Sequence, residues 1–211
     1  MIIVDTEYTT WPGALESGWA GPGQHREIVQ LSAIKVDENF RELDALDILI
    51  KPAINGTLSE LFTQLTTITQ ERLDNEGTSF QAGLKKFLDF CENGALPVIC
   101  MNADEAVFRE NCRLGNIPFP FPRSWHRLRP FLETQGVDTG KHASGDLHTL
   151  TDTPLTGHTH NALHDDRSMA CWLSYAQKRG RFTSLADLPT GAPTTDPRSN
   201  RGKPGAKPVI E

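Results

Sequence analysis

Two carboxylates near the start of the chain, Asp5 and Glu7, have a spacing that could bind a metal ion. They lie in an apolar segment over residues 2–8, and residues two positions apart on a β-strand project from the same face. Neighbouring carboxylates repel one another and lose hydration on burial, unless a cation lies between them. The Asp-Thr-Glu segment therefore indicates a divalent-cation site. A pair of charges at an exposed strand end gives the same pattern and is the alternative.

A third acidic residue, Asp104, follows the short apolar run over residues 97–101, which predicts a buried strand. Residues 104–114 have a helical pattern that Gly115 ends. Ligands of an α/β sheet bind beyond the C-terminal ends of its strands, which is where Asp104 is expected. An acidic residue at this position also caps a helix and suits its dipole, so a purely structural role is the alternative.

The segment HTHNALHDDRSMACWL contains a histidine and a further carboxylate, His160 and Asp165. We expect His160 in a loop and Asp165 in the first turns of a helix over residues 161–178, facing inward. Asp166 and Arg167 are expected on the outward face of this helix. Histidine suits general-base work near neutral pH. The five histidines between positions 142 and 164 fit no zinc template, because no cysteine accompanies them.

The elements that must position these residues indicate an α/β domain around a mixed sheet. Three strand-like segments come first, and the hydrophobic pattern then changes to a helical period with one further strand. Two capping boxes, at residues 67–70 and 78–81, predict helix starts. The expected strands are residues 2–8, 27–36, 40–50 and 97–101, and the expected helices are residues 80–91, 104–114, 125–134 and 161–178.

Composition indicates one globular domain in a reducing compartment. The 211 residues are 37% hydrophobic and 23% charged, which is enough for one sizeable core. A net charge of −6 excludes nucleic-acid binding by bulk positive charge, although a carboxylate-lined metal site adds negative charge of its own. The four cysteines show no CxxC spacing, and neither a signal peptide nor a membrane-spanning run is visible. We expect a cytoplasmic protein with no membrane partner.

Taken together and in this order, the motifs resemble the DEDDh 3′→5′ exonucleases, which have a ribonuclease H-like fold. Asp5 and Glu7 in IIVDTEYTTW fit the first motif, Asp104 in MNADEAVFRENC the second, and His160 with Asp165 in HNALHDD the third. The stretch KPAINGTLSELFTQLTTITQERLDNEGTSFQAGLKKFLDF is similar to the segment after the third strand in relatives of the histone-mRNA 3′-exonuclease.

The resemblance implies an exonuclease domain over residues 1–182, and composition predicts a Pro/Gly-rich, flexible tail over residues 183–211. It implies two Mg²⁺ ions, with Mn²⁺ able to substitute, that stabilise the attacking and leaving oxygens of a phosphodiester. Asp5 would contact both ions, Glu7 and Asp165 would ligate them, and Asp104 would hold a metal-bound water. His160 would accept a proton from the nucleophilic water. His158 is a competitor for that role, but only His160 has the family spacing to Asp165.

The implied reaction removes nucleoside 5′-monophosphates from single-stranded 3′ ends, with RNA favoured over DNA. Tyr8 and Trp11 follow the first motif, where an aromatic ring could stack on the terminal base. Arg127 and Arg129 end a basic strip that begins at Arg109 and could contact phosphates. Core packing of Tyr8 and helix-capping roles for the arginines at the start of the strip are the alternatives. Two other functions stay open, a DNA proofreading or repair exonuclease of the same fold and a catalytically silent RNA-binding module.

Overall fold

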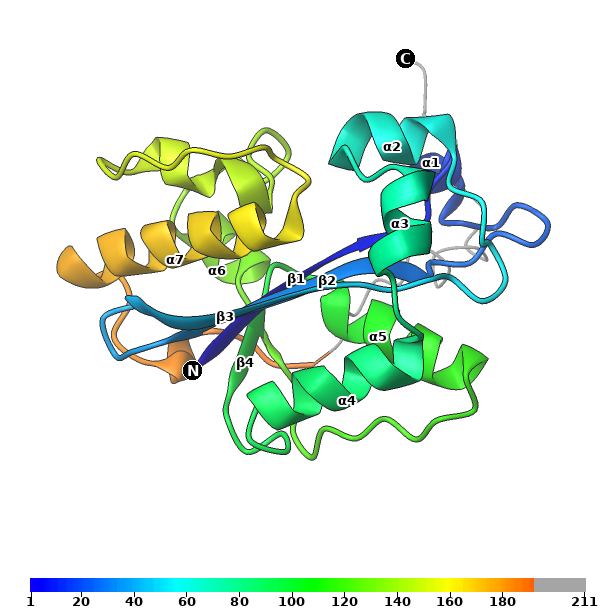
Figure 1. Ribbon diagram of the computed structural model, residues 1–211. Coiled ribbons are helices and arrows are strands. Elements are labelled where there is room, and N and C mark those ends of the chain that lie inside the picture. The colour runs from blue at the N-terminus through cyan, green and yellow to red at the C-terminus, as the bar shows by residue number, and fades with distance from the viewer. Residues whose placement is uncertain (192–211) are drawn as a thin grey trace, which may run out of the picture.

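The computed structural model describes residues 1–191 and contains one five-stranded mixed sheet between two layers of helices (Figure 1). The strand order is β3-β2-β1-β4-β5. The first three strands pair antiparallel, whereas β4 runs parallel to β1 and β5 runs parallel to β4. The predicted α/β class with a mixed sheet is therefore confirmed. The strands are β1 (Ile2–Tyr8), β2 (Ile28–Val36), β3 (Glu42–Leu49), β4 (Val98–Cys100) and β5 (His126–Arg127).

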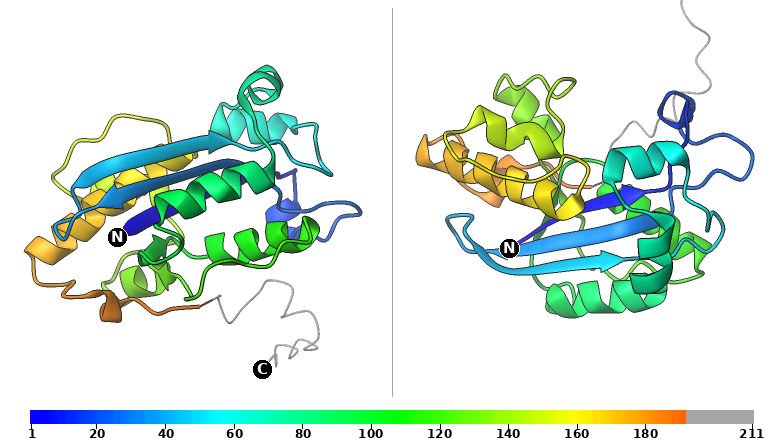
Figure 2. Two further views of the ribbon diagram at one scale, coloured as in Figure 1. Left: turned by 60° about the horizontal axis from the view of Figure 1, so that its bottom comes forward. Right: turned by 45° about the horizontal axis from the view of Figure 1, so that its top comes forward.

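Helices cover both faces of the sheet, as the two views of Figure 2 show. One face packs against α4 (Phe80–Phe90) and α5 (Asp104–Leu114), and the other against α6 (Arg129–Thr134) and α7 (Ala162–Lys178). A 3₁₀-helix, η1 (Ser144–Leu150), lies against α7, and another, η2 (Leu185–Asp187), follows α7 in the chain. Three short helices gather near the end of β1 (Figure 1): α1 (Ala14–Ser17), α2 (Glu60–Thr66) and α3 (Gln70–Glu76).

The central strand β1 is buried on both of its faces, which determines the surroundings of its two acidic residues. Ile2 and Val4 belong to the apolar cluster with α4 and α5, while Ile3 belongs to the cluster with α7. Because side chains alternate along a strand, Asp5 and Glu7 share the face of Ile3. The two carboxylates therefore continue an apolar face that α7 covers.

The predicted helix over residues 125–134 is wrong in its first four residues. His126 and Arg127 form β5, and α6 begins only at Arg129. The amide of Leu128 donates a hydrogen bond to the Cys100 carbonyl at 2.9 Å. β4 is buried, so the backbone groups along its edge require partners, and residues 126–128 supply them in place of a helical turn.

Both predicted capping boxes are offset from the true helix starts. Thr69 caps α3 by accepting a hydrogen bond from the Arg72 amide, and Ser79 caps α4 by accepting one from the Ala82 amide. Each cap is the hydroxyl residue immediately before the helix, whereas the boxes place it one or two residues earlier. The first box is wrong because Thr67 has a φ of 63° and ends α2 in the left-handed region.

Residues 183–191, which the sequence assigns to the tail, pack onto the domain instead. Leu188 is buried, the Arg127 amide donates to the Pro189 carbonyl at 2.8 Å, and Thr190 forms a bridge with His126. The segment pairs with the free edge of β5, which a sequence pattern of prolines and glycines cannot show. The rest of the predicted tail lies outside the described residues.

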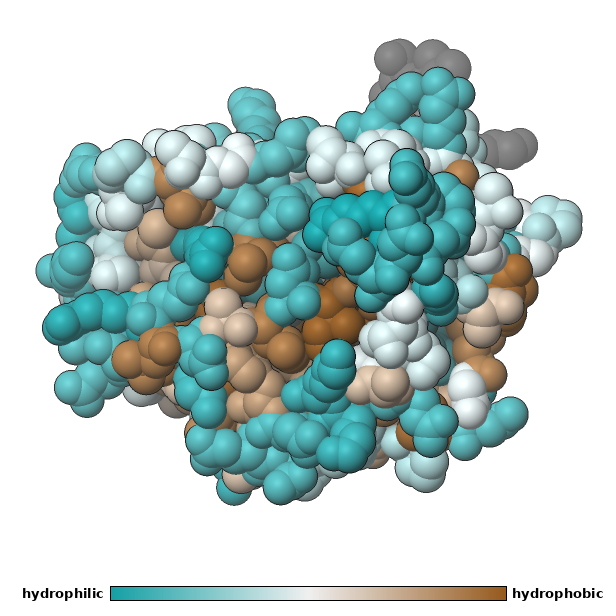
Figure 3. Space-filling model, in the orientation of Figure 1, coloured by the Kyte–Doolittle hydropathy of each residue, from teal (hydrophilic) through white to brown (hydrophobic). Residues whose placement is uncertain are grey.

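The surface in the orientation of Figure 1 is mostly hydrophilic, with apolar side chains visible across the middle of the face (Figure 3). The edge strand β3 carries acidic side chains along most of its length and exposes Leu43 at 64%. Over residues 1–191, the helices are too short or too polar to cross a membrane.

We expect Phe87→Ala to lower the free energy of unfolding by about 3–5 kcal/mol, the usual cost of removing a fully buried aromatic side chain. Phe87 is fully buried and its ring lies 5.3 Å from that of Phe108 and 5.4 Å from that of Phe121. Urea denaturation would measure the loss, with Leu43→Ala on the exposed edge as the control. A change below about 1 kcal/mol for Phe87→Ala would contradict this account of the core.

Candidate active site

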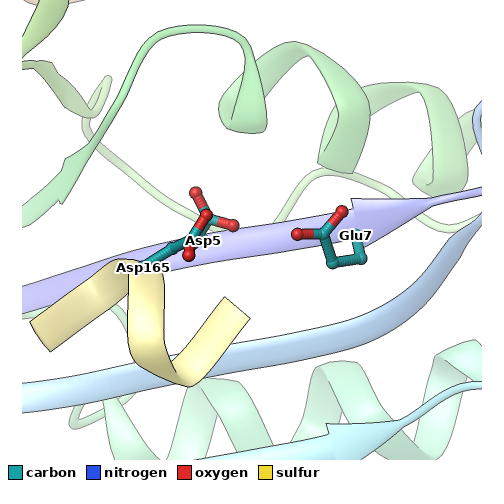
Figure 4. Close-up of side chains that lie close together, drawn as sticks. All are labelled: Asp5, Glu7 and Asp165. Carbon is teal, nitrogen blue, oxygen red and sulfur yellow. The ribbon is translucent and has the colours of Figure 1, made fainter. Parts of the chain in front are cut away.

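Three carboxylates from two elements converge on one face of the sheet (Figure 4). Asp5 and Glu7 project from β1, and Asp165 projects from the first turn of α7. Each offers an oxygen atom, and these atoms all lie within 4.8 Å of one another. Asp5 is 6% exposed and Asp165 is 2% exposed, so these charges meet away from bulk water. The structure thus brings together the first-motif and third-motif acids that the sequence predicts.

Asp104 lies beside this group rather than within it. It begins α5, directly after β4, and is buried. The hydroxyl of Thr6, between Asp5 and Glu7 in the sequence, donates to Asp104 Oδ1 at 2.8 Å. After burial, the charge of Asp104 is the largest cause of the raised pKa of Asp5. The second-motif acid therefore adds negative charge to the group and is fixed in place by β1.

Burial raises the pKa of every carboxylate in this cluster, and repulsion by neighbouring carboxylates adds to it for Asp5, Glu7 and Asp165. Burial is the larger cause for Asp5 and Glu7, and the neighbouring carboxylates add to it. Burial likewise raises the pKa of Asp104, and it raises that of Asp165 to about 7 against the hydrogen bond from Ser144. Four acids in such surroundings oppose ionisation unless a positive charge joins them.

The donor set fits a hard divalent cation. All of its atoms are carboxylate oxygens, the ligands that Mg²⁺ and Mn²⁺ prefer. Asp165 Oδ1 is buried and has no hydrogen-bond partner among the described residues, as expected of an oxygen reserved for another ligand. Among the acidic, histidine and cysteine residues of the described range 1–191, Asp5, Glu7 and Asp165 are the ones whose side chains lie close enough together to hold a metal ion.

His160 stands at the rim of the carboxylate group. Its φ of 68° places it in the left-handed region, one residue before the N-cap Asn161 of α7. Its Nδ1 lies 4.0 Å from Glu7 Oε1, and its side chain is 44% exposed. Partial burial lowers the pKa of His160, so its imidazole is neutral and able to accept a proton near pH 7. The side chain of its competitor His158 instead contacts the neighbouring Thr159 carbonyl.

Two polar residues of β2 that the sequence did not single out dock α7 against the sheet. Gln30 lies opposite Glu7, and Ser32 lies opposite Asp5, in the antiparallel register. The Gln30 side chain accepts a hydrogen bond from the Ala162 amide at 3.1 Å, at the first residue of α7. This bond fixes the start of the helix that carries Asp165. The alternation of β2 indicates a polar face, but only the register places that face beside the acids.

The prediction that Asp166 faces outward is wrong. Asp166 is fully buried and accepts a hydrogen bond from Ser32 Oγ at 2.5 Å. The start of α7 lies between β2 and η1, so a broad arc of the helix is covered and both Asp165 and Asp166 face inward. Arg167 does turn toward the edge of the sheet, where it forms a two-point ion pair with Glu42.

The aromatic residues predicted to contact substrate have different surroundings. Tyr8 packs against the α4–α5 core and meets the ring of Trp19 edge-to-face at 5.5 Å, and burial raises the pKa of its hydroxyl. Tyr8 therefore serves packing here, and its contact with substrate stays a prediction. Trp11 is partly exposed in the loop between β1 and α1.

The basic strip divides into paired and unpaired arginines. Arg109 forms a two-point ion pair with Glu105 and stacks on Phe119 at 3.7 Å, which is a structural role. Arg127 and Arg129 form no ion pair within residues 1–191, and each has a buried Nε atom without a hydrogen-bond partner there. These two guanidinium groups therefore have capacity for a further partner.

Comparison with solved structures shows the fold. A 3′-exonuclease whose structure shows 3′-end specific recognition of a histone mRNA stem-loop is 21% identical to this chain. Its TM-score is 0.74, and the match covers 90% of this chain and 84% of that one. The nuclease domain of 3′hExo, a DEDDh family member bound to rAMP, is 21% identical, with a TM-score of 0.73 over 90% and 94%. Cell-death related nuclease 4 is 20% identical, with a TM-score of 0.66 over 85% and 64%. These likenesses identify the ribonuclease H-like exonuclease fold that the motifs imply.

The family is shown by sequence. No curated protein sequence matches this chain significantly. The profile of the exonuclease family RNase_T, however, matches residues 2–170, which include all five residues of the three motifs. The resemblance to DEDDh exonucleases is confirmed, and the chain belongs to the RNase_T exonuclease family of nucleases.

Proposed function

We propose that this nuclease is a metal-dependent 3′→5′ exonuclease that removes nucleoside 5′-monophosphates from single-stranded nucleic acid, with RNA favoured. The observation that carries the proposal is the buried group of Asp5, Glu7 and Asp165, with His160 at its rim. The family indicates the class of reaction. The carboxylates can hold metal ions and His160 can act as a neutral base, and a reaction of this class needs both.

The carboxylates hold the cofactor and the histidine moves the proton. Asp5, Glu7 and Asp165 would hold two Mg²⁺ ions, for which Mn²⁺ could substitute, and Asp104 would act from beside the group. When bound, the ions offset the charge that develops on the attacking and leaving oxygens. A ring nitrogen of His160 accepts a proton from water as the water oxygen bonds to phosphorus. The bond from phosphorus to the 3′ oxygen then breaks, and this oxygen takes up a proton from solvent water, which leaves a new 3′ hydroxyl and a 5′-monophosphate.

The proposed substrate contacts are those that the sequence predicts. We propose that Trp11 stacks on the terminal base and that Arg127 and Arg129 contact phosphates through their unpaired guanidinium groups, and a substrate contact of Tyr8 stays a prediction. The preference for a 3′ end and for RNA is supported by the 3′-exonuclease of the histone mRNA stem-loop. Similar folds also include Exonuclease X with duplex DNA, so the sugar needs a direct test.

The reaction can be tested with single-stranded RNA and matching DNA, each labelled at the 3′ or the 5′ end, in Mg²⁺ and in EDTA. We expect 3′-labelled substrates to release labelled mononucleotide at once and 5′-labelled ones to shorten stepwise. EDTA should stop both. Faster decay of DNA would favour a repair exonuclease, and tight binding without cleavage in Mg²⁺ or Mn²⁺ would favour a silent RNA-binding module.

The cell compartment also belongs to the proposal. All four cysteines are free thiols, and three of them are buried. This supports a reducing environment such as the cytoplasm.

Asp5→Asn and His160→Ala should each reduce cleavage at least about 100-fold, the scale of a lost general base or metal ligand. Circular dichroism and thermal unfolding should show that both variants remain folded. Asp44→Asn on the exposed edge and His158→Ala are matched controls and should cleave normally. Equal loss in His158→Ala and His160→Ala would remove the basis for assigning the base to His160.

Without metal, thermal stability should fall as pH rises from about 4 to about 8. The pKa of Asp165 is about 7 in the folded protein and near 3.8 when unfolded, so the folded state binds its proton more tightly. This stabilisation is complete below about pH 4 and is lost as pH passes about 7. In EDTA at pH 8, Asp165→Asn should therefore unfold at a higher temperature than the wild type, with no such gap at pH 4.

Adding Mg²⁺ at pH 8 should raise the unfolding temperature of the wild type and not that of Asp165→Asn, because only the folded wild type has the complete ligand set. Differential scanning calorimetry of the wild type and of Asp165→Asn, each in EDTA and in Mg²⁺ at pH 8, measures these unfolding temperatures. A wild type that is equally stable in EDTA and in Mg²⁺ at pH 8 would count against a metal centre at this position.

A further inference from the structure

The carboxylate of Asp165 is held by a turn that lies about twenty residues earlier in the chain. Ser144, the first residue of η1, donates a hydrogen bond from Oγ to Asp165 Oδ2 at 2.9 Å. This bond orients one oxygen of the carboxylate and leaves Oδ1 without a partner. The contact joins η1 to α7 at the point where α7 carries its proposed metal ligand.

The next residue, Gly145, leaves space for the other oxygen. A Cβ atom at this position would lie 2.4 Å from Asp165 Oδ1 and 2.8 Å from Thr159 Cγ2, far inside contact distance. The φ of Gly145 lies outside the left-handed region, so its backbone would accept alanine. The need for glycine here is therefore steric and comes from the Asp165 carboxylate together with the methyl group of Thr159.

Two histidines fix this turn from the other side. His148 Nδ1 lies 2.9 Å and His164 Nε2 lies 3.2 Å from the Gly145 carbonyl oxygen. A carbonyl only accepts hydrogen bonds, so both ring nitrogens carry hydrogen and donate to it. The two rings also meet edge-to-face at 5.3 Å. These two hydrogen bonds tie the Gly145 backbone to His148 later in η1 and to His164 in α7. A shift of the turn would break both of them.

We propose that Ser144 and Gly145 form a positioning turn that sets the orientation of the Asp165 carboxylate for metal binding. This inference rests on the proposed function, because it assigns the two residues to the same metal site. Neither residue is a metal ligand. Ser144 restrains rotation of the carboxylate, and Gly145 permits its close approach. Residues that hydrogen-bond a metal ligand in this way commonly change metal affinity 10–100-fold when removed.

The test measures Mn²⁺ binding to the full-length chain by isothermal titration calorimetry, together with the unfolding temperature in EDTA. We expect Ser144→Ala to weaken Mn²⁺ binding about 10-fold. Ser144→Thr keeps the hydroxyl and should bind within about twofold of the wild type. Gly145→Ala should weaken binding at least as much as Ser144→Ala, because its methyl group displaces Asp165.

Matched controls separate positioning from general stability. Ser174→Ala lies further along α7, and Gly56→Ala places a Cβ only at ordinary contact distance from the Pro52 carbonyl, so both should bind Mn²⁺ normally. Unchanged Mn²⁺ affinity in Ser144→Ala would overturn the inference, and so would failure of Ser144→Thr to restore it. If the wild type cleaves its substrate and Ser144→Ala binds Mn²⁺ with unchanged affinity, only the inference about the positioning turn is wrong. No Mn²⁺ binding by the wild type overturns this inference and the proposed metal centre together.

Discussion

Repulsion among buried carboxylates is the constraint on which the rest of this structure depends. Asp5, Glu7 and Asp165 meet within 4.8 Å, and Asp104 lies beside them. In the absence of a cation, burial and like charge both oppose ionisation of these groups, which is why their pKa values are raised. A protein that brings such groups together must obtain the necessary stability from contacts elsewhere. Because the ionised carboxylates repel one another, a divalent cation that binds between them is strongly attracted.

The fold supplies that stability through its layered core and through polar contacts that fix the acidic side chains. The apolar clusters on the two faces of the sheet hold β1 from both sides. Around the acids, hydrogen bonds come from three different elements, β1, β2 and η1: Thr6 binds Asp104, Gln30 fixes the start of α7, and Ser144 binds Asp165. Each bond restrains an acidic side chain or the start of the helix that carries one. The site is thus preorganised by contacts that lie outside the predicted ligand set.

His160, the proposed base, shows how the same packing places an imidazole next to the acids. Asn161 caps α7 and Gln30 holds its first amide, so the residue before the cap leaves the helix in a left-handed conformation. This conformation places the imidazole at the edge of the carboxylate group and leaves it partly exposed. A nucleophilic water would meet the base at this edge, while the acids remain buried behind it. The proposed base His160 and the proposed ligand Asp165 thus differ in exposure within one short segment of chain.

The fold class, the central strand and the five motif residues could be predicted from the sequence, because they depend on local periodicity and on motif spacing. The alternation around Asp5 and Glu7 and the helix that carries Asp165 are properties of contiguous segments. Tertiary structure alone decided that Asp166 is buried against Ser32, that residues 126–127 form a strand and that Ser144 binds Asp165. Each of these depends on which distant segment packs beside it, and a local pattern contains no record of that neighbour.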